Sequence, residues 1–152
     1  MARKCHERIF NAAQVIESLV SVLDAGIDVV SPTNETGVAH PYGLNFWCFA
    51  IKPQEFLQKF GEFDENFAPA YYEDDDMAYR IKLLGGSIVT LPVYAYHAVR
   101  GSDMGQDWVN EAYEKNQKYY VEKWGGMPTH ETFTKPYNED CMDPTRWRND
   151  AR

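Results

Sequence analysis

Four carboxylates stand in a row at Glu73, Asp74, Asp75 and Asp76, directly ahead of a stretch with the periodicity of a helix. Such a row is costly in a folded protein, because like charges within about 4–6 Å disfavour joint ionisation. Three kinds of chemistry would justify it: favourable charge at a helix start, ligation of a hard metal ion, or general acid–base catalysis. Simple solvation of a surface segment is the fourth possibility.

The helix-start interpretation is the plainest, because acidic residues in a first turn complement the helix dipole by about 0.3–1 kcal/mol each. Three features weigh against it as a full account. The row has more acids than a helix start needs, it follows a loop rich in phenylalanine and tyrosine, and only Arg80 is close enough in sequence to compensate it. A carboxylate held in a cleft at this position could instead take a proton from an attacking hydroxyl.

The spacing Asp74-x-Asp76 also has the form of a site for Mg²⁺ or Mn²⁺, because both ions prefer oxygen ligands. Residues i and i+2 of a helix point to different faces, however, so this pair makes a poor chelate once the segment is helical. Asp76 and Arg80 are four residues apart and are expected to pair. General base catalysis therefore ranks above metal binding by these aspartates.

Residues 46–86 resemble the acceptor half of family-2 glycosyltransferases, which have the GT-A fold. In that family an aromatic strand leads into a short helix and then into a G-x-F-D-E-x-F turn, which here spans residues 61–67. The family's next motif is an E-D-x-D helix start with an arginine one turn later, here Glu73, Asp74, Asp76 and Arg80. The resemblance extends in motif order over residues 8–126.

The resemblance implies an inverting transfer of a sugar from a nucleotide sugar to a saccharide acceptor. Asp74 matches the family's catalytic base, which deprotonates the acceptor hydroxyl. Glu73 and Asp76 match residues that bind and orient the acceptor. Trp47 would give the acceptor a stacking surface, although a tryptophan at this place could equally belong to the core.

Further roles follow from the resemblance. Asp64 and Arg80 would support the site structurally. His97 follows a predicted strand, at a place where many relatives have a histidine that completes the metal and diphosphate site. Arg100 would neutralise the leaving diphosphate, and Ser102 belongs to the loop that closes over the donor. The plain alternative for His97 and Arg100 is a satisfied polar residue at a strand end and a solvated arginine.

The family pattern also implies a Mn²⁺ or Mg²⁺ ion, held by a D-x-D motif at the end of a strand. This sequence has no D-x-D preceded by apolar strand residues, and it opens on the helix that would follow that motif. We therefore expect an α/β fold with a partial GT-A sheet flanked by helices, lacking the N-terminal nucleotide-binding portion. A truncated transferase domain is expected over residues 1–126 and an extended tail over residues 127–152.

Hydrophobic periodicity and turn residues predict the elements that must position these side chains. Helices are predicted over residues 8–24, 53–60, 73–84 and 104–124. Strands are predicted over residues 27–31, 44–51, 87–91 and 93–98. The second strand is apolar on both faces, which predicts a central place in the sheet. Pro92 is expected to separate the last two strands.

Composition narrows the classes of function. The chain has 152 residues, of which 44% are hydrophobic, enough for one globular domain with a core. A net charge of −8 argues against binding to nucleic acid or to an anionic membrane surface. No apolar run reaches the roughly 18–20 residues that cross a bilayer. Three cysteines without C-x-x-C spacing argue against a disulfide framework and favour a reducing, cytoplasmic location.

Two functions from different classes remain open. The first is a glycosyltransferase-like protein with Asp74 as base, expected to be incomplete or inactive as an isolated chain. The second is a non-catalytic remnant that binds saccharide or only associates with itself. Because a half-sheet exposes an edge and apolar surface that a second copy would cover, a homo-oligomer is expected.

Overall fold

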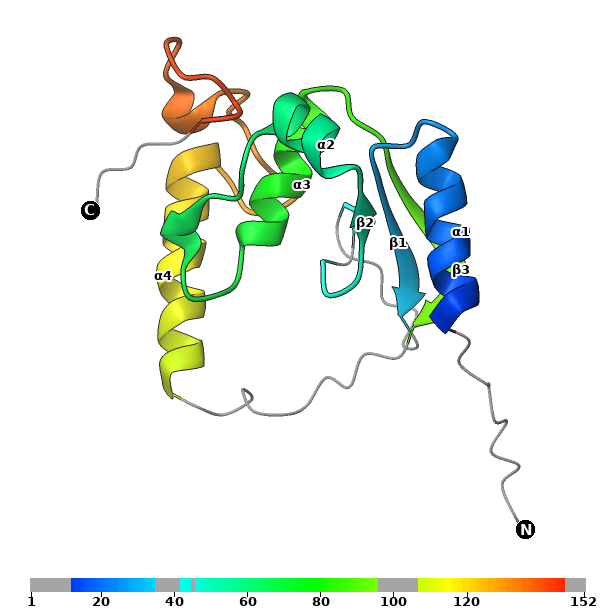
Figure 1. The fold of residues 1–152 in the computed structure, drawn as a ribbon. Coiled ribbons are helices and arrows are strands. Elements are labelled where there is room, and N and C mark those ends of the chain that lie inside the picture. The colour runs from blue at the N-terminus through cyan, green and yellow to red at the C-terminus, as the bar shows by residue number, and fades with distance from the viewer. Residues whose placement is uncertain (1–11, 35–41, 45, 96–106, 147–152) are drawn as a thin grey trace.

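The computed structural model describes residues 12–34, 42–44, 46–95 and 107–146 (Figure 1). Within these ranges the protein is a mixed α/β fold with four α-helices and a sheet of three strands. In chain order the elements are α1 (Ala12–Asp24), β1 (Val29–Asn34), β2 (Ala50–Ile51), α2 (Pro53–Phe60), α3 (Glu73–Leu83), β3 (Ile88–Ala95) and α4 (Asp107–Trp124). Short 3₁₀ turns lie at Glu65–Phe67 and Pro136–Asn138.

The sheet has the strand order β2-β1-β3, with β1 at its centre. β1 pairs antiparallel with β2 and parallel with β3. Val29 and Val30 of β1 are both fully buried, because successive side chains of a strand point to opposite faces and both faces are covered. Val30 packs against Leu19 and Leu23 of α1. Val29 belongs to the core that α2 and α3 form on the other face.

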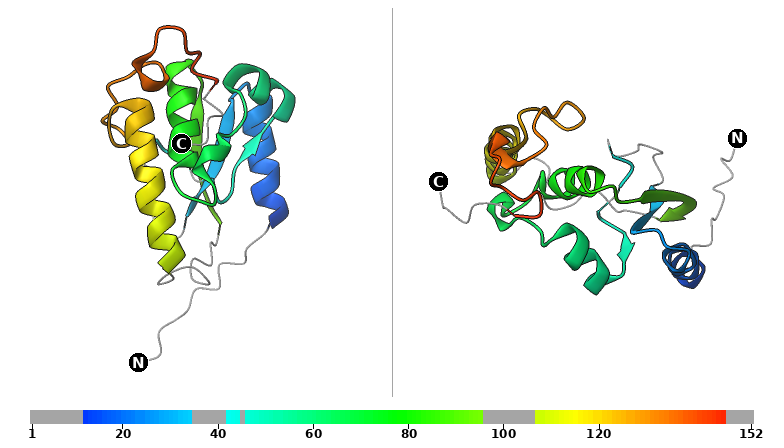
Figure 2. Two further views of the ribbon diagram at one scale, coloured as in Figure 1. Left: turned by 90° about the vertical axis from the view of Figure 1, so that its left-hand side faces the viewer. Right: turned by 90° about the horizontal axis from the view of Figure 1, so that it is seen from above.

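The elements form successive layers, in the order α1, sheet, α3 and α4 (Figures 1 and 2). α2 and α3 contribute Phe60, Met77 and Ile81 to the core beside the sheet, all fully buried. A second cluster, which includes Tyr120 and Trp124 of α4, fills the space between α3 and α4. α3 is therefore the element that joins the sheet to α4, and its N-terminal end carries the acidic row.

The prediction of a central strand over residues 44–51 is wrong. Among the described residues of this run, only Ala50 and Ile51 join the sheet, as a short edge strand. Phe46 packs edge-on against Phe49 and Phe63, with ring centroids 4.8 and 5.5 Å apart. These aromatic contacts, which involve the turn after α2, hold the apolar run in turns outside the sheet. Such tertiary packing overrides a local strand pattern.

The two strands predicted around Pro92 form a single strand, β3. The register shifts opposite this proline: Leu91 pairs with Pro32 of β1, whereas Tyr94 pairs with Thr33. An irregularity of this kind leaves extra residues unpaired on one strand, and it can therefore accommodate a proline, which has no N–H to donate. β1 is also longer than predicted and continues to Asn34.

The predicted helices are found, with small changes at their ends. α2 has the predicted bounds, with a proline in its first turn, and α3 ends one residue earlier than expected. α1 and α4 are described from Ala12 and Asp107 onward. Residues 8–11 and 104–106 of those two predictions lie outside the described ranges.

Residues 127–146, within the tail predicted over residues 127–152, pack on the helices (Figure 1). The hydroxyl of Tyr79 in α3 donates a hydrogen bond to the carbonyl of Phe133, at 2.8 Å. The carboxylate of Glu131 accepts hydrogen bonds from the hydroxyls of Tyr42 and Tyr120. This segment is therefore part of the same packed unit as α3 and α4.

Candidate functional site

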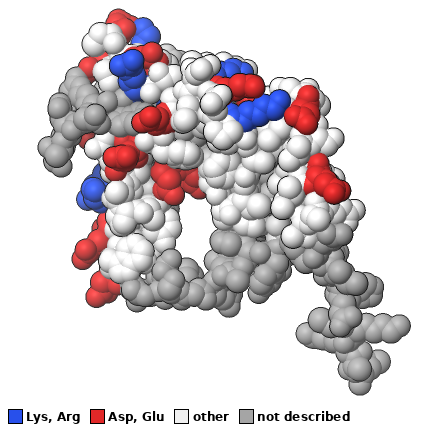
Figure 3. Space-filling view, viewed as in Figure 1, with Lys and Arg blue, Asp and Glu red and all other residues white. Residues whose placement is uncertain are grey.

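A cavity of about 900 Å³ opens beside the N-terminal end of α3 and reaches α4. In the space-filling view the molecule is hollowed between α4 and the sheet, and acidic side chains gather beside the hollow (Figure 3). Aromatic rings supply much of the cavity lining, namely Phe46, Trp47, Tyr71, Tyr72, Trp108 and Tyr113. A mostly apolar pocket with a few convergent polar groups is the usual form of a small-molecule site.

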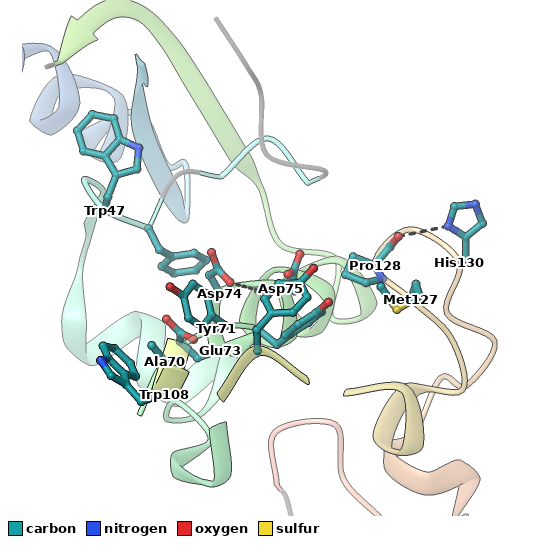
Figure 4. A pocket seen from close by; sticks show the side chains of 13 residues that line it. Trp47, Ala70, Tyr71, Glu73, Asp74, Asp75, Trp108, Met127, Pro128 and His130 are labelled. Atoms are coloured by element: carbon teal, nitrogen blue, oxygen red, sulfur yellow. Dashed lines mark hydrogen bonds between the residues drawn. The ribbon is translucent and has the colours of Figure 1, made fainter. Parts of the chain in front are cut away.

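Three carboxylates of the acidic row, Glu73, Asp74 and Asp75, line this cavity. In Figure 4 they lie between Trp47 and Trp108 on one side and the segment that follows α4 on the other. Both tryptophans retain contact with solvent, and 40% of Trp108 is exposed. The arrangement therefore places acidic oxygens and indole rings on one accessible surface.

The backbone that enters this site is unusual. Tyr71 and Tyr72 have φ angles of 77° and 71°, in the left-handed region that non-glycine residues rarely adopt. Tyr72 is the N-cap residue of α3, directly before Glu73, and its side chain makes no capping hydrogen bond. Two such residues in succession turn the chain sharply just before Glu73, so the acidic row begins directly at the cavity wall.

Asp74 and Glu73 have different environments. One oxygen of Asp74, Oδ1, accepts a hydrogen bond of 2.9 Å from the backbone N–H of Asp75 (Figure 4). Oε2 of Glu73 is buried and accepts no hydrogen bond from the described part of the chain. Burial raises the pKa of Glu73, and the charges of Asp74 and Asp75 raise it further.

Asp76 points away from the cavity into the interior, where its carboxylate is fully buried. Oδ2 accepts a 3.0 Å hydrogen bond from Nε of Arg80. Oδ1 lies 2.7 Å from Nζ of Lys123 and accepts a 2.7 Å hydrogen bond from Nε1 of Trp124. Burial acts to raise the pKa of Asp76, but the charges of Lys123 and Arg80 outweigh it and lower that pKa.

The expected acceptor contact of Asp76 does not fit this position, because a fully buried and ion-paired carboxylate cannot reach a saccharide in the cavity. The i, i+2 argument is confirmed, since Asp74 lines the cavity while Asp76 faces the core. The expected pair of Asp76 and Arg80 is confirmed too. Asp76 thus anchors α3 and has no direct contact with the cavity.

Asp64, in the turn after α2, has the structural position that was expected of it. Its Oδ1 accepts a 3.0 Å hydrogen bond from the backbone N–H of Asn66. Its Oδ2 lies 2.7 Å from Nζ of Lys123 and accepts a 2.8 Å hydrogen bond from the hydroxyl of Tyr119. Lys123 thereby ties both Asp64 and Asp76 to α4.

Of the residues predicted to form the site, the structure brings Trp47, Glu73 and Asp74 together in the cavity. It places Asp64 and Arg80 in the buried network that supports α3. His97, Arg100 and Ser102, predicted to bind the metal and the diphosphate, lie outside the described residues. The role of Asp74 as base stays a prediction.

Several residues of the site were not predicted, above all Lys123 and Trp108. A pattern in the sequence could have revealed Lys123. Asn116, Tyr120 and Lys123 recur at helical spacing on the buried face of α4, and a lysine on such a face needs an acidic partner. For Trp108, an aromatic residue in the first turn of α4, no comparable pattern distinguishes a core role from a place in a cavity.

Within residues 12–34, 42–44, 46–95 and 107–146, no three His, Cys, Asp or Glu side chains are grouped so that they could hold a metal ion. Asp76 is already paired with two basic side chains, so the Asp74-x-Asp76 spacing does not form an ion site here. No helix in these ranges is long and apolar enough to cross a membrane.

No family model, curated protein or solved structure matches this chain. The resemblance to glycosyltransferases thus depends on the order and spacing of the motifs alone.

Proposed function

We propose that this chain carries the acceptor side of an inverting glycosyltransferase, with the cavity as its saccharide site. The observation that supports this most directly is the shared lining of the cavity by Asp74, Glu73, Trp47 and Trp108. Sugar rings present C–H faces that pack on aromatic rings, and their hydroxyls donate hydrogen bonds to carboxylates. A partial GT-A fold is part of the same proposal.

Asp74 is the base in the proposed reaction. The acceptor hydroxyl donates a hydrogen bond to the carboxylate of Asp74 and gives up its proton as its oxygen attacks the anomeric carbon of the donor. The bond from that carbon to the nucleotide diphosphate breaks, and the diphosphate leaves with the electron pair. Attack on the side opposite the leaving group inverts the anomeric configuration.

Glu73 has a complementary role in this proposal. It lines the cavity beside Asp74, and its carboxyl oxygens can accept hydrogen bonds from sugar hydroxyls. Glu73 would orient the acceptor while Asp74 takes its proton.

The donor side rests on the resemblance alone. There, His97 would help to hold Mn²⁺ or Mg²⁺, and Arg100 and Ser102 would contact the diphosphate. The described residues offer no set of side chains that fits the metal, so we derive no step through it. A cytoplasmic location and self-association also belong to the proposal. Light scattering that shows a monomer at micromolar concentration would contradict the self-association.

Calorimetric titration with UDP- and GDP-sugars, with and without Mn²⁺, combined with a transfer assay on oligosaccharide acceptors, tests the proposal. If wild type binds none of these donors under any condition, the chain alone is not a working transferase. Where wild type does transfer sugar, we expect Asp74→Asn to abolish transfer with the fold unchanged. Glu111→Gln, an exposed carboxylate on α4 outside the cavity lining, should leave transfer intact. Transfer that persists in Asp74→Asn would remove Asp74 as the base.

A non-catalytic saccharide-binding protein is the second candidate. The aromatic lining favours it, because rings such as Trp47 and Trp108 suffice to bind a sugar without any chemistry. The two functions predict the same saccharide binding by Asp74→Asn but different consumption of donor by wild type. Asp74→Asn would bind saccharide whichever function is right. Wild type would consume donor only if the protein is the enzyme.

A further inference from the structure

One asparagine of α4 holds the loop that leads into the acidic helix start. Asn116 is fully buried, and the two N–H groups of its side-chain amide are shared among three backbone carbonyls of that loop. The acceptors are the carbonyl oxygens of Phe67, Ala70, at 2.7 Å, and Tyr71, at 3.2 Å. A single side chain therefore fixes the course of the chain from Phe67 to Tyr71.

The amide of Asn116 is used only as a donor. Its Oδ1 is buried and accepts no hydrogen bond from the described residues. The orientation of the amide follows from chemistry, because all three facing groups are carbonyls and need an N–H. A buried acceptor without a partner costs free energy. This cost is offset by the hydrogen bonds that fix three backbone carbonyls of the loop.

The loop needs such a hold because of its backbone. Tyr71 and Tyr72 have φ angles of 77° and 71°, and residues in this region persist only where their surroundings over-determine them. Asn116 fixes the carbonyl of Tyr71, and the neighbouring Gln117 donates a 2.9 Å hydrogen bond to the hydroxyl of Tyr72. α4 thereby constrains both strained residues.

We propose that Asn116 is a positioning residue for the cavity. It does not line the cavity itself, but its three hydrogen bonds set the conformation of Tyr71 and Tyr72, and hence the direction in which Glu73 and Asp74 leave the loop. The effect of Asn116 on saccharide binding rests on the proposed function of the cavity as a saccharide site. The hold on the loop is a property of the free protein and can be measured without a ligand.

Hydrogen–deuterium exchange of the full chain tests the hold itself. Asn116→Asp keeps the shape of the side chain but sets an oxygen against the three carbonyls, and Asn116→Ser retains one donor. We expect exchange in peptides over residues 67–75 to rise by about tenfold or more in Asn116→Asp and by less in Asn116→Ser. Peptides of α1 and β1 should be unchanged. Asn110→Asp, at an exposed position of the same helix, is the matched control.

Two outcomes of this measurement decide whether Asn116 fixes the loop. If Asn116→Asp does not fold, the comparison of Asn116→Ser with wild type replaces it. Unchanged exchange over residues 67–75 in a folded variant would overturn the inference, and faster exchange there that is absent in Asn110→Asp supports it.

Saccharide affinity separates a positioning role from mere support of the fold. With maltotetraose, cellotetraose and chitotetraose as probes, well below the melting temperature of each variant, we expect Asn116→Ser to bind about tenfold more weakly than wild type. A purely structural role would lower the melting temperature but leave the affinity of the folded protein unchanged, which would overturn the positioning role. If wild type binds none of the probes, the proposed function fails. The exchange measurement still tests whether Asn116 fixes the conformation of the loop.

Discussion

Lys123 of α4 places its ammonium group 2.7 Å from the carboxylate of Asp76 in α3, and neither side chain is exposed to solvent. The same Nζ lies 2.7 Å from Oδ2 of Asp64. A buried charge left without its partner is strongly destabilising. The pair therefore fixes how α3, which carries the acidic row, sits against α4.

Replacing Lys123 should show this dependence. Lys123→Met fills a similar volume but leaves two buried carboxylates without their shared cation, so we expect the free energy of unfolding to fall by about 3–5 kcal/mol. Urea denaturation followed by circular dichroism measures the change. Lys118→Met, an exposed position on the same helix, should change stability by less than about 0.5 kcal/mol. Equal decreases in the free energy of unfolding for both variants would show that the buried ion pair does not stabilise the fold.

The stability of the protein should fall in acid because of Asp76. Lys123 and Arg80 outweigh the effect of burial and hold the pKa of Asp76 below its ordinary value of 3.8. A carboxyl group with a lowered folded-state pKa adds stability above its unfolded-state pKa, and that stability is lost as the pH falls through the folded-state pKa. Asp76→Asn should therefore be less stable than wild type near neutral pH, and the difference should narrow below about pH 4. A difference independent of pH would contradict this.

Glu73 should have the opposite effect. Burial raises its pKa above the ordinary value of 4.5, so the folded state is penalised once the pH is high enough to ionise the group. The penalty is absent below the unfolded-state pKa and is complete above the folded-state pKa. We expect Glu73→Gln to raise the melting temperature at neutral pH and to have little effect below about pH 4. Thermal unfolding at a series of pH values checks this, with Glu111→Gln as the exposed control. A lower melting temperature at neutral pH would refute it.

Gly61 ends α2 with a φ of 77°, and a Cβ there would lie 2.6 Å from the carbonyl oxygen of Thr145. Gly85 has a similar φ of 68°, but a Cβ there would meet nothing within 4 Å. Gly85→Ala should therefore show the cost of the backbone conformation alone, about 1–2 kcal/mol. Gly61→Ala should cost more, because the segment around Thr145 must also move. Equal losses of unfolding free energy in urea would show that this close approach does not matter.

Local features of the fold could be predicted from the sequence, because their causes lie within a few residues. Pro53 and Gly61 delimit α2 as expected, and the pair of Asp76 and Arg80 follows from helix geometry. The opposite directions of Asp74 and Asp76 follow from the same geometry.

What could not be predicted depends on contacts between distant segments. The aromatic packing of Phe46 on Phe63 removes the run before β2 from the sheet. Lys123 comes to Asp76 only because α4 packs on α3. The hold of Asn116 on the loop before the acidic row likewise requires the two segments to meet in space. Neither hydrophobic periodicity nor motif spacing predicts contacts between segments that are distant in the sequence.

Trp108 provides the most direct test of the cavity. Its side chain is 40% exposed and lines the cavity together with Asp74, so its removal should cost little stability and much of any stacking with a sugar. We expect Trp108→Ala to weaken oligosaccharide binding by about tenfold, near the value of one aromatic contact. Titration calorimetry measures the affinity, and thermal unfolding should show that the fold is unchanged.

Val121→Ala is the matched control, because Val121 is an apolar residue of α4 with 37% exposure and does not line the cavity. Its affinity for the same oligosaccharides should equal that of wild type. If the two variants bind equally well, the sugar does not occupy the surface between Trp108 and the acidic row. Asp74 would then have no acceptor hydroxyl beside it, and its proposed role as base would fail as well.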